Sequence, residues 1–87
     1  MIELVRITVA GDRTLDLAFS DGCTARWSAD AIILRNTILT RPLEDPAFFR
    51  RAFIESGALA WPNGLEFSAR SLHEKLSAAG ALVRKAA

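Results

Sequence analysis

The chain is poor in the residues that most reactive sites and covalent cross-links require. Among its 87 residues there is one cysteine, Cys23, and one histidine, His73. A single cysteine cannot form an internal disulfide, so nothing in the composition calls for an oxidising compartment. One histidine and one cysteine cannot fill a zinc shell, and the carboxylates show no calcium-loop spacing. No glycine-rich phosphate cradle is present either. The sequence therefore predicts no metal and no cofactor.

Net charge and long apolar runs are also missing. Eleven basic residues nearly balance ten acidic ones, and the net charge of +1 gives no global attraction to nucleic acid or to an anionic membrane. No apolar run approaches the roughly 20 residues that a membrane helix needs. The short apolar run bracketed by Glu3 and Arg6 lacks the basic start and the length of a secretory signal. We expect a soluble, cytoplasmic protein with no membrane partner.

What is present is an apolar fraction of 51% with 24% charged residues, which is typical of an ordered globular protein. A chain of this length makes one domain near the small end of what folds alone. We expect that domain to span residues 1–80. Residues 81–87 are expected to form a short tail that frays or extends the last helix.

Three runs of alternating apolar residues predict a three-stranded antiparallel meander between residues 4 and 28. Gly11-Asp12 and Asp21-Gly22 are the turn signals between these runs. The opposite face carries Arg6, Asp16 and Arg26, and an ordinary solvated face is favoured there over a polar binding surface. The residues expected on the buried face are Val5, Ile7, Val9, Leu15, Leu17, Phe19, Cys23, Ala25 and Trp27.

The middle of the chain is expected to be irregular and partly helical. A short helical turn is predicted to begin at residues 28–30, with Ile32 and Ile33 packed beneath it. Asp45-Pro46 predicts a helix start, because aspartate accepts hydrogen bonds from first-turn amides and proline loses none at the first position. That helix is expected to continue for about two turns to Ala52 and to face the sheet with Phe49 and Ala52.

Residues 58–61 and 65–67 predict a further hairpin around Pro62-Asn63-Gly64. These turn residues suit a type I turn followed by a left-handed glycine. Two interpretations stay open for Trp61: its ring covers the edge of the core, which is favoured, or it is exposed for recognition. The turn itself has a complete backbone explanation.

A C-terminal helix is expected after Phe67, capped by Ser68 or Ser71 and stopped by Gly80. Its apolar stripe would be Leu72, Leu76 and Ala79, which places His73 on the side facing water. Together these elements predict an α+β fold: an antiparallel sheet that starts with a meander, then a short helix, a hairpin and a final helix.

The search for catalytic groups finds only one nucleophile and base pair, Cys23 and His73. Cys23 is on the apolar register of a strand, where a buried and inert thiol is favoured. Four aspartates could be paired as acid and base, but turn or cap positions already explain Asp12, Asp21 and Asp30 and leave only Asp16. We expect no catalytic residues and no enzyme. Helix-turn-helix pairs and single-strand platforms are not visible either.

Three segments in this order resemble a bacterial family, the domain of unknown function 2442. They are Phe19-Ser20-Asp21-Gly22, the segment from Pro42 to Phe49, and Trp61-Pro62-Asn63-Gly64 with Leu65-Glu66-Phe67. The resemblance covers roughly residues 5–76 and implies a compact α+β fold without established catalytic residues. Some relatives carry an added helix-turn-helix segment, for which this chain has no room. The family is often associated with another small protein in an arrangement that looks toxin–antitoxin-like.

We therefore expect a protein-interaction module that acts on a second small protein or as a homodimer. Its apolar composition leaves candidates for an interface, and these are Ile38, Leu39, Phe48 and Trp61. The alternative is a weak nucleic-acid-binding or regulatory module that uses a basic patch of Arg41, Arg50 and Arg51, although acidic neighbours offset this patch. A third hypothesis, an enzyme with a site formed across a dimer, could use only Cys23 and His73.

Overall fold

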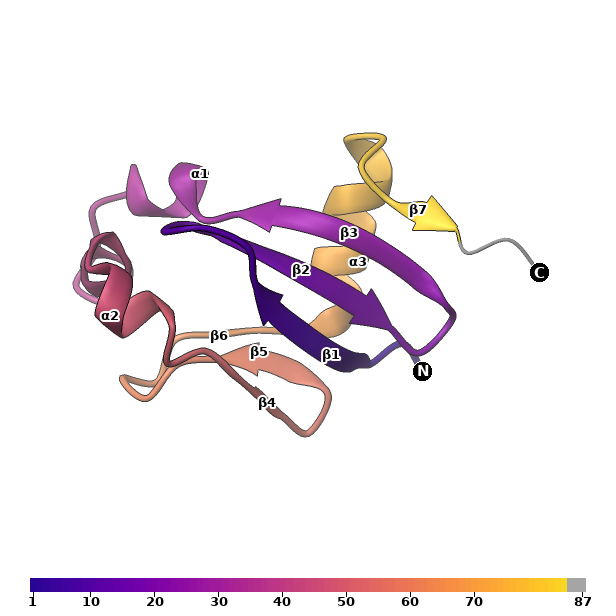
Figure 1. Cartoon of the computed structure of the whole chain (residues 1–87), viewed down its shortest axis with the longest axis horizontal. Helices are drawn as coiled ribbons and strands as arrows, with labels where there is room; N and C mark the ends of the chain where they lie inside the picture. Colours follow the sequence, from indigo (N-terminus) through magenta and orange to yellow (C-terminus); the bar gives the residue numbers. More distant parts are fainter. Residues whose placement is uncertain (85–87) are drawn as a thin grey trace.

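The computed structural model describes residues 1–84 and shows two small antiparallel sheets with short helices (Figure 1). The α+β fold predicted from the sequence is confirmed. The elements in chain order are β1 (Leu4–Val9), β2 (Thr14–Phe19), β3 (Cys23–Ser28), α1 (Asp30–Ile33), the 3-10 helix η1 (Arg41–Glu44), α2 (Pro46–Phe49), β4 (Phe53–Glu55), β5 (Ala58–Ala60), β6 (Glu66–Phe67), α3 (Ala69–Ala78) and β7 (Val83–Arg84).

The first sheet is the predicted meander with one added strand. Its order is β1-β2-β3-β7, and all neighbours are antiparallel. The alternation in β2 and β3 is confirmed, since one face of both strands is buried and the other is wetted. The buried residues of these two strands are Leu15, Leu17, Phe19, Cys23, Ala25 and Trp27.

The prediction for β1 was wrong at Val5, which is 60% exposed. The register between β1 and β2 shifts between Leu4 and Arg6, so Val5 is the extra residue of a bulge and Leu4 takes the buried position. Ile7 packs against the core as expected. The prediction was also wrong at Val9, which is 41% exposed because β1 lies at the edge of the sheet and Val9 is its last residue.

The second sheet has the order β4-β5-β6. Strand β4 was not predicted; it pairs with β5 through a two-residue turn in which Ser56 and Gly57 have φ of 50° and 81°. Positive φ at both positions is the signature of a tight hairpin turn whose twist matches the strands. The Leu4 N–H donates to the Gly57 carbonyl at 2.8 Å, which ties this turn to the first sheet.

The predicted hairpin around Pro62-Asn63-Gly64 is confirmed. The Gly64 N–H donates to the Trp61 carbonyl at 3.1 Å, and Gly64 has a φ of 95°. Asn63 serves two segments: its Oδ1 accepts from the Leu65 N–H, and its Nδ2 donates to the Leu39 carbonyl at 3.1 Å. The turn therefore also anchors the loop that precedes η1.

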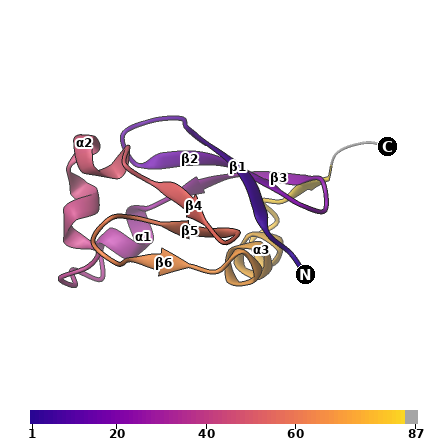
Figure 2. The ribbon, with the colours of Figure 1, turned by 90° about the horizontal axis from the view of Figure 1, so that it is seen from below.

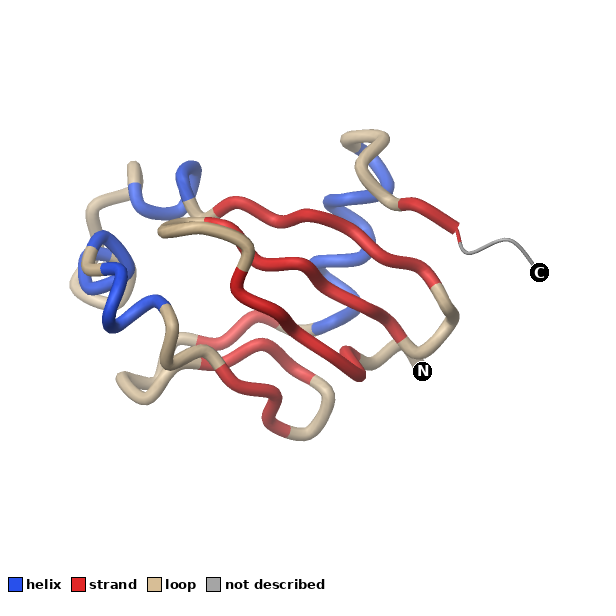
Figure 3. The backbone as a smooth tube through the Cα atoms, viewed as in Figure 1, coloured by secondary structure: helices blue, strands red, loops and turns tan. Residues whose placement is uncertain are grey.

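The middle segment forms the left-hand end of the molecule, where short helices alternate with loops (Figure 3). Ile32 and Ile33 belong to α1 and are buried, as predicted. Asp45 caps α2 by accepting from the Ala47 N–H at 3.0 Å. The helix ends at Phe49, earlier than expected, because the amides of Arg51 and Ala52 bond three residues back and tighten into a turn.

Helix α3 is capped by Ser68, whose Oγ accepts from the Ser71 N–H. The predicted stop at Gly80 is confirmed: its φ is 70°, and the Ala81 N–H donates back to the Leu76 carbonyl in a Schellman arrangement. Ala79 is exposed, so the predicted stripe was wrong there. Because α3 starts at Ala69, the buried positions are Ala69, Leu72 and Leu76.

The predicted frayed or helical tail was also wrong for the residues that the structure describes. Val83 and Arg84 form β7 and pair with Thr24 and Cys23 of β3, so the domain extends beyond residue 80. This pairing gives the segment after α3 a partner that its own sequence pattern does not reveal. The part of the predicted tail at residues 85–87 lies outside the described residues.

The core lies between the first sheet on one side and α3 with β5 and β6 on the other (Figure 2). An aromatic cluster occupies its centre. The rings of Trp27 and Trp61 have centroids 6.0 Å apart, and Phe49 and Phe67 pack around Trp61. Within residues 1–84, no helix has the length and apolar character needed to cross a membrane.

Candidate functional site

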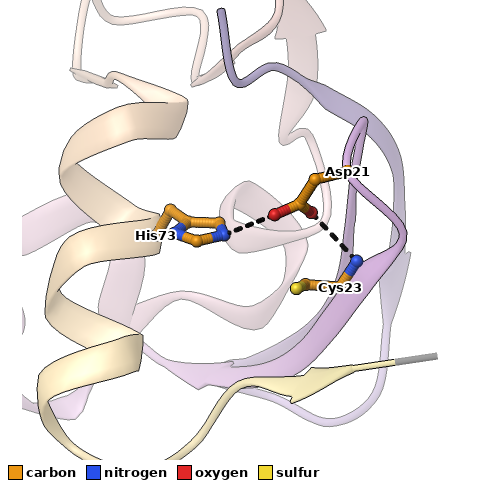
Figure 4. Close-up of side chains that lie close together, drawn as sticks. All are labelled: Asp21, Cys23 and His73. Carbon is orange, nitrogen blue, oxygen red and sulfur yellow. Dashed lines mark hydrogen bonds and ion pairs between the residues drawn. The ribbon is translucent and has the colours of Figure 1, made fainter. Parts of the chain in front are cut away.

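Three side chains with metal-ligating or nucleophilic atoms meet where the β2–β3 turn faces α3 (Figure 4). Asp21 belongs to the turn, Cys23 begins β3, and His73 is on α3. A carboxylate oxygen, the sulfur and a ring nitrogen all lie within 4.8 Å of one another. We call these residues the Asp21–Cys23–His73 cluster.

Asp21 is held by the turn that the sequence predicted for it. Its Oδ1 accepts from the Cys23 N–H at 2.9 Å, and its Oδ2 accepts from His73 Nε2 at 2.8 Å. The Cys23 amide and, less strongly, the His73 side chain stabilise the carboxylate, so the pKa of Asp21 lies below its usual range. Asp21 is therefore ionised at neutral pH and acts as an acceptor only.

Cys23 is buried, with 1% of its surface exposed, as the sequence predicted. Burial raises the pKa of its thiol, and the neighbouring Asp21 carboxylate raises it further. The thiol therefore keeps its proton at neutral pH, and attack by a nucleophilic thiolate is suppressed.

The prediction that His73 faces water was wrong. Only 19% of its side chain is exposed, because its ring packs edge-on against Phe19 with centroids 5.1 Å apart and its Nε2 is bonded to Asp21. A base for a catalytic dyad needs a ring nitrogen directed at the nucleophile, whereas Nε2 is directed at the carboxylate. The expectation that the chain is not an enzyme stays a prediction.

Sequence reasoning named all three residues, with Cys23 and His73 as the one nucleophile and base pair, but did not place Asp21 beside them. The assignment of Asp21 to a turn is correct. It misses the second carboxylate oxygen, which bonds to His73 on α3. The available signal was the i, i+2 spacing of Asp21 and Cys23 around a tight turn. The approach of His73, 52 positions later, had no local signal.

The four residues predicted for a protein interface have different surroundings. Ile38 and Leu39 are exposed, at 82% and 43%, in the loop before η1. Phe48 is partly buried, packs against the core and carries the Arg51 guanidinium 6.0 Å above its ring. Trp61 is 1% exposed and its indole N–H donates to the Phe49 carbonyl at 3.0 Å, so Trp61 is core and its inclusion was wrong.

The predicted basic residues Arg41, Arg50 and Arg51 are all exposed at the end of the molecule formed by η1 and α2. Arg41 donates from Nε to the Asn36 Oδ1 at 3.0 Å. Within residues 1–84, none of the three forms an ion pair with a carboxylate. Their charge is therefore available to a ligand.

The open face of the first sheet is polar, as predicted. Arg26 donates to both carboxylate oxygens of Asp16 from the neighbouring strand, at 2.8 and 3.2 Å. This bond lowers the pKa of Asp16. Both side chains are largely exposed, so the pair contributes little to stability.

The chain matches no protein-family model, no curated protein and no solved structure. The resemblance to the domain of unknown function 2442 therefore stays a prediction.

Proposed function

We propose that this protein is a protein-interaction module that binds a second protein through the loop before η1. The observation that carries the proposal is the exposure of three large apolar side chains in six residues: Leu34 at 83%, Ile38 at 82% and Leu39 at 43%. We call them the 34–39 surface. Single exposed apolar residues are ordinary, whereas a cluster of them is typical of an interaction site.

The loop that carries this surface is held in one conformation by side-chain hydrogen bonds. Thr37 and Thr40 bond to each other through hydroxyls and amides, with Oγ1 atoms 2.9 Å apart. Arg41 binds the Asn36 amide, and Asn63 binds the Leu39 carbonyl. A loop fixed before binding loses less conformational entropy when a partner arrives.

The charge around the 34–39 surface selects the partner. Arg35, Arg41, Arg50 and Arg51 are exposed near this end, where they outnumber the exposed Glu44 and Asp45, and within residues 1–84 none of the four arginines pairs with a carboxylate. The complementary partner is a protein with an apolar patch and an acidic rim. Such a partner agrees with the expectation of a second small protein, in an antitoxin-like arrangement.

The test compares Ile38→Asp with Val83→Asp, which replaces a comparably exposed side chain (62%) on β7. Partners captured from the native host by the unmodified chain are purified, and their dissociation constants are measured directly. We expect Ile38→Asp to weaken binding at least about tenfold, because it places a charge in a desolvated contact. Val83→Asp should leave the affinity unchanged, and thermal melting checks that both variants are folded.

Three outcomes contradict the proposal. Equal binding by both variants would move the interface away from the 34–39 surface. A concentration-dependent dimer that Ile38→Asp abolishes, with no second protein bound, would make the partner another copy of the chain. Binding to nucleic acid that falls steeply with salt and is lost in Arg41→Ala would favour the basic patch of Arg41, Arg50 and Arg51 instead.

A further inference from the structure

We propose that the Asp21–Cys23–His73 cluster is a binding site for a single divalent transition-metal ion, with Zn²⁺ the best match. The 34–39 surface has no part in this site. The fold brings three different donors to one point: a carboxylate from the β2–β3 turn, a thiol from β3 and an imidazole from α3.

The donor set selects the class of metal. One thiol, one imidazole and one carboxylate combine soft, borderline and hard ligands, and this mixture suits Zn²⁺ or Co²⁺ rather than Mg²⁺ or Ca²⁺. Three protein ligands leave a fourth tetrahedral position for water or another small ligand. Structural zinc sites use four protein ligands, so this site belongs to the open class.

The spacing is close to what a bound ion requires. With metal–nitrogen and metal–oxygen bonds of about 2.0–2.1 Å, tetrahedral ligands lie about 3.3 Å apart. Asp21 Oδ2 and His73 Nε2 are 2.8 Å apart, so this pair has to open by only about half an ångström. No two ligand atoms are more than 4.8 Å apart, so the sulfur has to approach by little more than about 1 Å.

The surroundings hold the ligands before a metal binds. The amide of Cys23 fixes the Asp21 carboxylate, and the ring of Phe19 orients the imidazole of His73. Side-chain exposures of 27% for Asp21 and 19% for His73 leave a path from solvent to the site. His73 also lines a hollow of about 750 Å³ between the N-terminal segment, the β4–β5 turn and α3.

Metal binding replaces protons at two of the ligands. In the metal-free cluster the thiol carries its proton, and the Nε2–H of His73 donates to Asp21, because a carboxylate can only accept. When Zn²⁺ binds, the thiol proton leaves to solvent and the sulfur becomes a thiolate ligand. Exchange with water removes the proton from Nε2, so this nitrogen binds the ion and Nδ1 carries the ring proton.

The experiment is a titration of the untagged protein with Co²⁺ as a spectroscopic probe, followed by displacement with Zn²⁺. We expect one Co²⁺ per chain, visible bands typical of four-coordination, and a thiolate-to-cobalt charge-transfer band in the near ultraviolet. Cys23→Ala should abolish the charge-transfer band. His73→Ala and Asp21→Ala should each weaken binding at least about 100-fold, more than the loss of an outer-shell partner. The matched control is Glu74→Gln, which removes an exposed carboxylate beside His73 that pairs with Arg70 and should change nothing.

Because Cys23 is buried, Cys23→Ala can lose the charge-transfer band by unfolding as well as by losing a ligand. A second measurement therefore uses the unmodified chain. Nitrogen NMR of the single histidine should show Nε2 bound to Zn²⁺ and Nδ1 carrying the proton. Failure of Co²⁺ to give a charge-transfer band, or a histidine spectrum unchanged by one equivalent of Zn²⁺, overturns the proposal. Equal loss of binding in Glu74→Gln also overturns it, because the ion would then be held by the surface of α3.

Discussion

At the scale of single residues, Trp61 shows how a turn motif and a core residue share one short segment. The indole fills the space between Trp27, Phe49 and Phe67, and its N–H reaches the Phe49 carbonyl. A buried N–H without a partner is costly, so this bond is what allows a tryptophan to lie in the centre of a small core.

Replacing Trp61 with phenylalanine should therefore destabilise the fold more than replacing Trp27 with phenylalanine. Both changes remove similar ring volume, but Trp27 is 9% exposed and its indole forms no hydrogen bond with the described residues. We expect an extra loss of about 1 kcal/mol for Trp61→Phe, the typical net value of one hydrogen bond. Urea denaturation of the two variants measures the difference, and equal losses would show that the bond to Phe49 is energetically unimportant.

Asp21 gives a pH dependence with a definite sign. Its folded pKa lies below its usual value of about 3.9, so its stabilising effect is complete above that pH and is lost as pH falls through the folded pKa. In Asp21→Asn we expect lower stability at neutral pH and a shallower decline on acidification. Melting temperatures between pH 7 and pH 2 would show it, with Asp16→Asn as the control that removes the other depressed carboxylate. An Asp21→Asn profile parallel to that of the unmodified protein would contradict this account.

At the scale of elements, two glycines with similar backbone angles have different surroundings. Gly22 and Gly57 have φ of 88° and 81°, and either would strain an alanine. A Cβ at Gly57 would lie 2.8 Å from the Cβ and Cγ of Glu3, whereas a Cβ at Gly22 would meet nothing within 4 Å. The difference arises because Gly57 is the point where the second sheet touches the start of the first.

We expect Gly22→Ala to cost about 1 kcal/mol, from backbone strain alone. Gly57→Ala should cost at least about 1 kcal/mol more, because Glu3 has to move and the Leu4 to Gly57 bond is disturbed. Chemical denaturation of both variants tests the order. A larger loss at Gly22 would mean that the junction between the sheets is softer than the structure shows.

The elements that could be predicted from sequence are those with an internal signal. β2 and β3 each have six residues of strict alternation, and α2 and α3 begin at side-chain caps. β4 and β7 contain three and two residues, which is too short for a period to show. Both form because a partner strand is already in place, and the sequence pattern of such a short segment does not show which strand it will pair with.

At the scale of the whole molecule, the proposed sites also differ in whether a local sequence signal could have revealed them. Ile38 and Leu39 could be named from sequence because surplus apolar residues in a loop have a local signal. His73 was misplaced, and two interpretations stayed open for Trp61, because burial of a helix side or a strand end depends on what packs opposite. The Asp21–Cys23–His73 cluster joins the first third of the chain to its last helix, and no spacing rule reaches across 52 positions.

The meander of the first sheet and the elements that cover it come from different parts of the chain, and this order has a consequence during synthesis. The meander at residues 4–28 leaves the ribosome first, with the apolar side chains of β2 and β3 uncovered. The residues that cover it, in β5, β6 and α3, follow only after residue 57, and at typical elongation rates α3 is complete ~2.5–10 s after β3. During that interval the nascent chain exposes the apolar face of the meander. Slower translation of the middle segment should therefore increase the dependence of the chain on ribosome-bound chaperones.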